Sequence, residues 1–425
     1  MKGIRLCLLL GAAAAWGQAP TLLSRGERME FPAATARTIF RPFAGVISGY
    51  DSAPLTPVAG AGGGAFQELD GGLDLVHSGR RASLRLDYRF GLRHYPHLSR
   101  LDRSNQAVNL DARFRLSRRW ALAVRDVGSS SSFGGSLEAD PSPSAGFFPE
   151  GGPEVFHART IANTALVDVA YFPTARASIS LGGDGFLVER QHRGLADVAG
   201  WRARADFAYR YGRRKTLSAA YSFTRFEHSR SFGGAEYAVY AAGHSARLGK
   251  RSELDLLAGA GLLRSAGVRS VELDPEIARI LGTSRGAEVF RLRTWMPHLA
   301  AGWTRGLGRG ALRVQYARMV SDGGGLSGLA RQNQVSLAVA MPAARSWRWS
   351  GLLAGRSYRS LDTLLYDAST AAAGFTLARR LGPRLEAVAR YHYAFYHFDR
   401  GLLRHFHRHQ LAGGVVFYPG DPASY

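Results

Sequence analysis

The chain has 425 residues, and its 55 lysines and arginines against 33 acidic residues give it a formal net charge of +22. A chain this basic could bind nucleic acid, but its arginines fall singly on alternating positions and form no basic patch or helix. That distribution argues against nucleic acid as a partner, and no segment approaches the 18 uninterrupted apolar residues of a transmembrane helix.

Residues 1–19 have the pattern of a secretory signal peptide. A basic start is followed by an apolar run over 6–15, too short to span a membrane, and then by small residues. The single cysteine, Cys7, lies in this run, so the mature protein is expected to have neither disulfides nor thiolate metal sites. Residues 20–41 have no clear period and are expected to form a periplasmic lead-in.

The strongest periodic pattern lies between residues 82 and 116. Over 83–93 every second residue is polar or glycine, and the residues between them are leucines, Tyr88 and Phe90. The pattern returns over 108–116 after a polar link, so we expect an antiparallel hairpin. The pattern holds for about nine residues or more, the length of a tilted strand that crosses a bilayer, whereas strands of soluble sandwiches run to about five or six.

The sequence therefore predicts an all-β fold: a transmembrane antiparallel β-barrel, with its apolar side toward lipid and its charged side toward a wet lumen. A secreted, soluble all-β protein is the alternative. Further strands are expected around residues 43–50, 69–75, 120–124, 165–171, 179–187, 201–211, 217–223, 242–248, 254–262, 290–293, 312–316, 335–341, 347–353, 371–377, 385–395 and 411–417. Counting gives about 18 strands, and other boundary choices allow 16. The barrel is expected over 42–418, with a periplasmic tail over 419–425.

Connections of two lengths alternate along the chain. Short basic turns are expected on the periplasmic side and longer links on the extracellular side. The longest links are expected to be loops over 128–154 and 265–285, the second with a short helix begun at Asp274 and Pro275. Near Pro297 the alternation slips by one residue, and we interpret the slip as a bulge.

Large aromatic residues such as Trp120, Trp201 and Trp347 stand near the expected strand ends, where an aromatic girdle is typical. With these features the chain resembles bacterial outer-membrane β-barrels of the porin-like class, in architecture and over nearly its whole mature length. The resemblance implies an outer-membrane location among lipid and lipopolysaccharide, and insertion by the barrel-assembly machinery that reads a terminal aromatic, here Phe417 or Tyr425. It also allows a homo-oligomer.

Charged residues on the predicted inner face are the candidate functional residues. Basic groups outnumber acidic ones among them, so the interior should favour anions; the alternative is that cross-strand ion pairs only stiffen the wall. The residues assigned to this face are Arg85, Asp87, Arg89, Arg93, Asp111, Arg113, Arg115, Arg202, Arg204, Asp206, Arg210, Arg291, Arg293, Arg313, Arg348, Arg384, Glu386 and Arg390.

The function expected from this pattern is a channel for small hydrophilic or anionic solutes, since a barrel of 16 to 18 strands leaves an aqueous pore. An export pore for an anionic exopolysaccharide is the first alternative, because arginines could pass its carboxylates along. A plugged structural or adhesive barrel is the second.

No covalent chemistry is expected, because the chain contains no nucleophile elbow, HExxH or P-loop motif. His405, His407 and His409 alternate along one strand face and are interpreted as interfacial side chains, so no metal and no cofactor are predicted. Glycines such as Gly182 and Gly261 are expected to allow curvature of the strands and are not interpreted as a phosphate-binding loop.

Overall fold

The computed structural model describes residues 37–53, 62–97, 102–131, 159–191, 196–229, 233–308, 310–321, 329–341, 346–361, 367–399 and 405–420. The strands are β1 Arg37–Asp51, β2 Gly64–Ser78, β3 Ala82–His94, β4 Arg103–Arg115, β5 Trp120–Ser131, β6 Thr160–Tyr171, β7 Ala177–Arg190, β8 Val198–Gly212, β9 Lys215–His228, β10 Gly233–Arg247, β11 Ser252–Glu272, β12 Arg285–Leu307, β13 Gly310–Ser321, β14 Ala330–Met341, β15 Trp347–Ser360, β16 Ala368–Arg380, β17 Leu385–Phe398 and β18 His405–Phe417. One helix, α2 Pro275–Leu281, interrupts this series. Within the described ranges no helix has the length and apolar character to cross a membrane.

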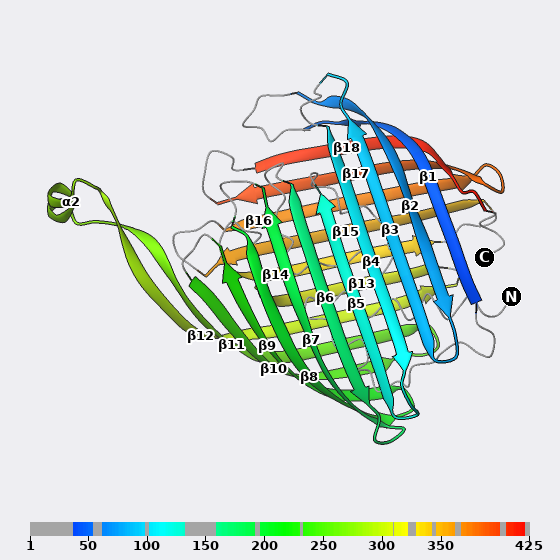
Figure 1. Ribbon diagram of the computed structural model, residues 1–425, viewed down its shortest axis with the longest axis horizontal. Coiled ribbons are helices and arrows are strands. Elements are labelled where there is room, and N and C mark those ends of the chain that lie inside the picture. The colour runs from blue at the N-terminus through cyan, green and yellow to red at the C-terminus, as the bar shows by residue number, and fades with distance from the viewer. Residues whose placement is uncertain are drawn as a thin grey trace.

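The strands form a single closed antiparallel sheet of 18 strands (Figure 1). Each strand pairs with the next along the chain, and β1 also pairs with β18, from Ala44 opposite Phe417 to Asp51 opposite Gln410. That last pairing leaves the sheet without an edge. The predicted all-β antiparallel barrel of about 18 strands is confirmed.

Alternation along each strand separates an outer from an inner face. In β8, Trp201 and Phe207 are exposed, whereas Arg202, Arg204 and Ala208 between them are buried. In β18, Leu411 and Val415 are likewise exposed while Arg408 is buried. Because successive side chains of a strand point to opposite faces, apolar residues cover the outside and charged residues face the interior.

Both ends of the described chain lie at one end of the barrel (Figure 1), since the β1–β18 pairing places Ala44 beside Phe417. The connections at that end are short; β8 ends at Gly212 and β9 begins at Lys215. The connections at the opposite end are mostly longer. Short turns mark the periplasmic end of such barrels and long loops the extracellular end.

The first strand starts earlier than expected, so the predicted lead-in extended too far. β1 begins at Arg37, and Phe40 is exposed on the outer face while Ile39 and Arg41 take the inner parity. A short stretch of mixed polar and apolar residues hid this period. Residues 1–19 and most of the remaining lead-in lie outside the described residues.

The segment 265–285 is not a loop, although its helix was correctly placed. β11 continues to Glu272 and pairs with β12 along its whole length, so the two strands extend past their neighbours with α2 at the tip (Figure 1). The side chain of Asp274 caps the helix by accepting from the backbone N–H of Glu276 at 2.9 Å. Small residues such as Gly267 and Gly286 interrupt the apolar alternation here, so the sequence did not show the two strands. Of the other expected loop, 128–154, residues up to Ser131 belong to β5 and the rest lies outside the described residues.

The predicted bulge at Pro297 is wrong. Pairing of β12 with β11 runs in continuous register through Pro297, opposite Ala260. Pairing of β12 with β13 begins only at Leu299, opposite Arg318. Pro297 therefore lies where β12 still has one free edge, a position that tolerates a residue without an N–H donor.

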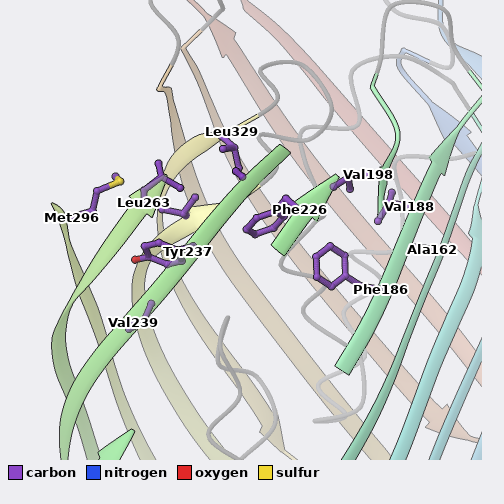
Figure 2. Close-up of a cluster of buried hydrophobic side chains, with 12 residues drawn as sticks. Ala162, Phe186, Val188, Val198, Phe226, Tyr237, Val239, Leu263, Met296 and Leu329 are labelled. Atoms are coloured by element: carbon purple, nitrogen blue, oxygen red, sulfur yellow. The ribbon is translucent and has the colours of Figure 1, made fainter. Parts of the chain in front are cut away.

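An apolar cluster lies on the inner face at the extracellular half of the wall (Figure 2). Phe186 and Phe226 come from β7 and β9 with ring centroids 5.6 Å apart, and Tyr237 and Leu263 continue the cluster on β10 and β11. The Tyr237 ring occupies the space that a side chain at Gly261 would need. This glycine thus permits the close approach of the Tyr237 ring, a role that the sequence did not show.

Candidate functional site: the inner wall of the barrel

Most of the predicted inner-face residues lie on the face opposite the exposed apolar side chains of their strands. Arg113 on β4, for example, alternates with the outward Phe114, which is 37% exposed. The residues placed in this way are Arg85, Asp87, Arg89, Arg93, Asp111, Arg113, Arg115, Arg202, Arg204, Asp206, Arg210, Arg313, Arg348, Glu386 and Arg390.

Three predicted residues are not on the inner wall. Arg291 and Arg293 share the parity of Trp295, which is 60% exposed, and so lie on the outer face of β12. The error follows from taking the apolar residues of this segment as lipid-facing: Leu292 packs against the apolar cluster on the inner face, so its neighbours on the strand point outward. Arg384 lies in the turn before β17, where its carbonyl accepts from the N–H of Tyr418.

On β3, β4 and β5 the carboxylates and guanidinium groups form ion pairs within and between strands. Asp111 accepts from Arg113 at 2.9 Å and from Arg125 of the next strand at 2.7 Å. Arg89 donates to Asp87 of its own strand at 3.1 Å. At Asp111, one carboxylate is therefore shared between two guanidinium groups.

A second cluster joins β6, β7 and β8 and is more deeply buried. Arg204 reaches Asp168 at 3.3 Å and Asp184 at 3.6 Å, and Arg202 lies 3.8 Å from Asp184. The Asp168 side chain is fully buried. It occupies the space where Gly182 lacks a side chain, so this glycine serves the ion-pair cluster and not only the curvature of the strand.

A third cluster spans the seam where β1 meets β18. Asp51 accepts from Arg408 at 2.6 and 3.1 Å, from Gln410 at 2.7 Å and from the Tyr95 hydroxyl at 3.2 Å. Tyr95 follows β3 and is buried, and burial raises the pKa of its phenol. Every polar atom of the Asp51 carboxylate thus has a partner, as a buried charge requires.

Two further ion pairs lie near this seam, on β2, β3 and β17. Arg390 donates to Asp70 at 3.0 Å, which joins residues 320 positions apart in the sequence. The Arg93 Nε donates to Glu68 at 2.6 Å, and the Arg93 guanidinium stacks over Phe66. Side-chain ion pairs therefore link the strands near the seam, in addition to the backbone hydrogen bonds of the sheet.

At the periplasmic end, Glu386 of β17 pairs with Arg348 of β15 and accepts from the Tyr418 hydroxyl at 3.1 Å. Tyr418 follows β18, and burial raises the pKa of its phenol. Arg348 and Glu386, each predicted separately on the inner face, therefore meet across the intervening strand β16.

The sequence analysis missed Asp51, Arg125 and Arg408. Arg408 alternates with the three histidines. Only the histidines were considered as candidate functional residues in that stretch, and they lie on the opposite, outer face. The histidines are exposed on the outer face, where His407 and His409 bond the hydroxyls of Tyr393 and Tyr391 at 2.7 and 2.9 Å. The signal that could have found Arg408 is its place between two outward histidines on the last strand.

The barrel has an outward apolar surface on all sides, a charged interior and no open sheet edge. Closure satisfies the backbone hydrogen bonds without water, which a sheet in hydrocarbon requires, and the apolar outer face matches lipid. The chain is an outer-membrane β-barrel of 18 strands. The predicted localisation and architecture are thereby confirmed.

Comparisons with known proteins add no site. No protein family and no curated protein matches the sequence. Among solved structures, the barrel is similar to Pseudomonas aeruginosa OccK2 (OpdF) in complex with glucuronate, with 11% identity, 90% of this chain and 98% of that chain covered, and a TM-score of 0.42. It is also similar to the ferric-catecholate import receptor Fiu of E. coli K12, with 9% identity, 92% and 82% covered, and a TM-score of 0.43. Acinetobacter baumannii OccAB3 has 9% identity, 91% and 100% covered, and a TM-score of 0.40.

Proposed function

We propose that the barrel is an outer-membrane channel for small hydrophilic solutes, with an electropositive lumen that favours anions. It would act by diffusion and electrostatic selection, without covalent chemistry. A barrel of this strand number is wide enough for an aqueous path, and rings of basic side chains favour anions in such a path.

The observation that carries the proposal is the sharing of Asp111 between Arg113 and Arg125. One carboxylate can neutralise one guanidinium group, so this part of the wall keeps a net positive charge. Arg115 lies further along the same face of β4 and is exposed. A surplus of positive charge beside an aqueous path lowers the electrostatic energy of an entering anion.

The test is single-channel recording of the refolded protein in a planar bilayer under a salt gradient. The reversal potential of the wild type is compared with that of a double variant, Arg85→Glu with Arg113→Glu. We expect anion selectivity in the wild type and a shift toward cations in the variant, because two positive charges of the inner wall become negative.

The matched control is Arg225→Glu. Arg225 is exposed on the outer face of β9, where it pairs with Glu227 at 3.1 Å. Its substitution changes the net charge of the protein without changing the inner face, so its reversal potential should equal that of the wild type. An equal shift in both variants would contradict the assignment of selectivity to the lumen. No conductance from a folded barrel would instead favour a plugged, non-conducting protein.

A further inference from the structure

Two pairs of arginines face each other directly across neighbouring strands on the outer surface of the barrel. Arg264 of β11 lies opposite Arg293 of β12, and Arg331 of β14 lies opposite Arg359 of β15. All four share the parity of exposed apolar residues in their strands, such as Trp295 and Val335. Like charges placed directly opposite each other destabilise a sheet, so two such pairs on one surface call for a compensating anion.

Two other arginines of the wall show how such a charge can be compensated by an acid. On the inner face, Arg93 lies opposite Arg103, and Glu68 bonds Arg93. On the outer face of β9, Arg225 pairs with Glu227.

The four outer arginines differ from these, because no ion pair within the described residues involves any of them. Glu236 lies opposite Arg264 in the register of β10 and β11, yet the two form no ion pair within the described chain. The Nε atom of Arg331 is buried and has no hydrogen-bond partner among the described residues.

The strand ends show where these arginines lie along the barrel axis. Pairing of β10 with β11 ends at Ala266, two residues beyond Arg264. Arg331 is the second residue of β14, and Arg359 is the last but one of β15. All four therefore lie near the end of the wall opposite the chain termini, at the outer leaflet.

The surface below the arginines is apolar. Trp295, Tyr316, Val335 and Leu353 on the same outer face are between 37% and 60% exposed. A ligand that fits both regions has acyl chains against the apolar surface and an anionic head at the arginines. Arginine binds phosphate through paired, charge-assisted hydrogen bonds.

We propose that Arg264, Arg293, Arg331 and Arg359 form a binding site for the phosphate groups of a phosphorylated glycolipid in the outer leaflet. The site is independent of the proposed channel, since all four residues lie outside the barrel. Arg318 of β13 lies opposite Asn333, two residues from Arg331, with its Nε also buried and unpartnered among the described residues, and extends the site beside the Arg331 pair.

The test titrates the folded, full-length barrel in detergent with diphosphorylated lipid A, and separately with the same lipid after removal of both phosphates. Native mass spectrometry reports the bound fraction. The variants are Arg264→Gln with Arg293→Gln, and Arg331→Gln with Arg359→Gln. Heat-dependent mobility on gels checks that each variant is folded, and the comparison of the two lipids on the wild type remains decisive if a variant does not fold.

We expect the diphosphorylated lipid to bind the wild type at least about tenfold more tightly than the dephosphorylated lipid, and each double variant to lose about tenfold, the effect of one charged hydrogen bond. Arg225→Gln is the matched control, being an outer arginine with its own acid, and should bind as the wild type does. Equal binding of the two lipids, or an equal loss in the control, would overturn the proposal. Complete displacement of the lipid by millimolar inorganic phosphate would also overturn it, because the site would then recognise a soluble anion and not a lipid.

Discussion

Asp51 of β1 accepts hydrogen bonds from both Nε and Nη2 of Arg408 on β18, and both side chains are almost fully buried. We expect Asp51→Asn to destabilise the barrel by about 3 kcal/mol or more, because the Arg408 charge would stay buried without its partner. Denaturant unfolding in lipid vesicles measures the loss. Arg225→Gln on the exposed outer face should change stability little, and equal unfolding midpoints for the two variants would refute the prediction.

Gly182→Ala tests the packing of the second charge cluster. An added methyl group would overlap the Asp168 carboxylate, so we expect a loss of about 1 to 3 kcal/mol in the free energy of unfolding. Gly185→Ala on the same strand is the control, since the nearest atom to its added methyl group is the Gly200 oxygen at 4.0 Å. The idea fails if the two alanine variants unfold at the same denaturant concentration.

The long β11–β12 hairpin should be dispensable for folding. Its outer part, residues 268–289, pairs only within the hairpin, because β10 pairing ends at Ala266 and β13 pairing begins at Leu299. Replacing 268–289 by Asn-Gly, a sequence that favours a two-residue hairpin turn, should leave the thermal unfolding midpoint of the barrel unchanged. A large drop in that midpoint would mean that the hairpin supports the wall.

If the channel function is correct, Asp111→Asn should increase anion selectivity. The substitution removes the carboxylate between Arg113 and Arg125 and leaves both positive charges in place. The anion-to-cation permeability ratio, obtained from the reversal potential, should rise, and Arg113→Gln should lower it. A fall of the ratio in Asp111→Asn would contradict the assigned sign of the lumen.

We expect the link between β3 and β4 to change with pH as Asp102 titrates. It accepts from the Tyr95 N–H at 2.9 Å and bonds His94 at 2.7 Å, and these bonds hold its pKa below the ordinary 3.8. A carboxyl group with a lowered pKa stabilises the fold above its unfolded pKa, and this contribution is lost as the pH falls through its folded pKa. The Tyr95 amide resonance should therefore shift with a midpoint below 3.8 in the wild type and stay constant in Asp102→Asn. A midpoint above 3.8 would show that the hydrogen bonds to Tyr95 and His94 do not lower the pKa of Asp102.

Much of the architecture follows from local alternation. The period of two over residues 83–93 fixed both the strand type and its charged face, and the count of turns gave the strand number. The helix at Asp274 was predictable because the capping residue and Pro275 are local signals.

The errors come from features that a local pattern does not carry. The face of Arg293 depended on Leu292, which packs against the apolar cluster inside the barrel and not against lipid. Alternation of apolar and charged residues does not by itself show which of the two faces is the inner one. The partner of Arg408 was equally hidden, since Asp51 lies 357 residues away and the two meet only when the barrel closes.

The pairing of β1 with β18 also bears on how the protein can be made. The first strand of the barrel to leave the ribosome keeps one side unpaired until the last strand arrives, because its second partner is the final strand of the chain. Contacts of such large sequence separation form slowly, and an unpaired strand edge invites association with other chains. A nascent chain that stops before His405 lacks β18 and would have no way to complete the sheet. Integration into the membrane is therefore expected only for the finished polypeptide. Until then the unpaired edge of β1 has to be shielded from other chains.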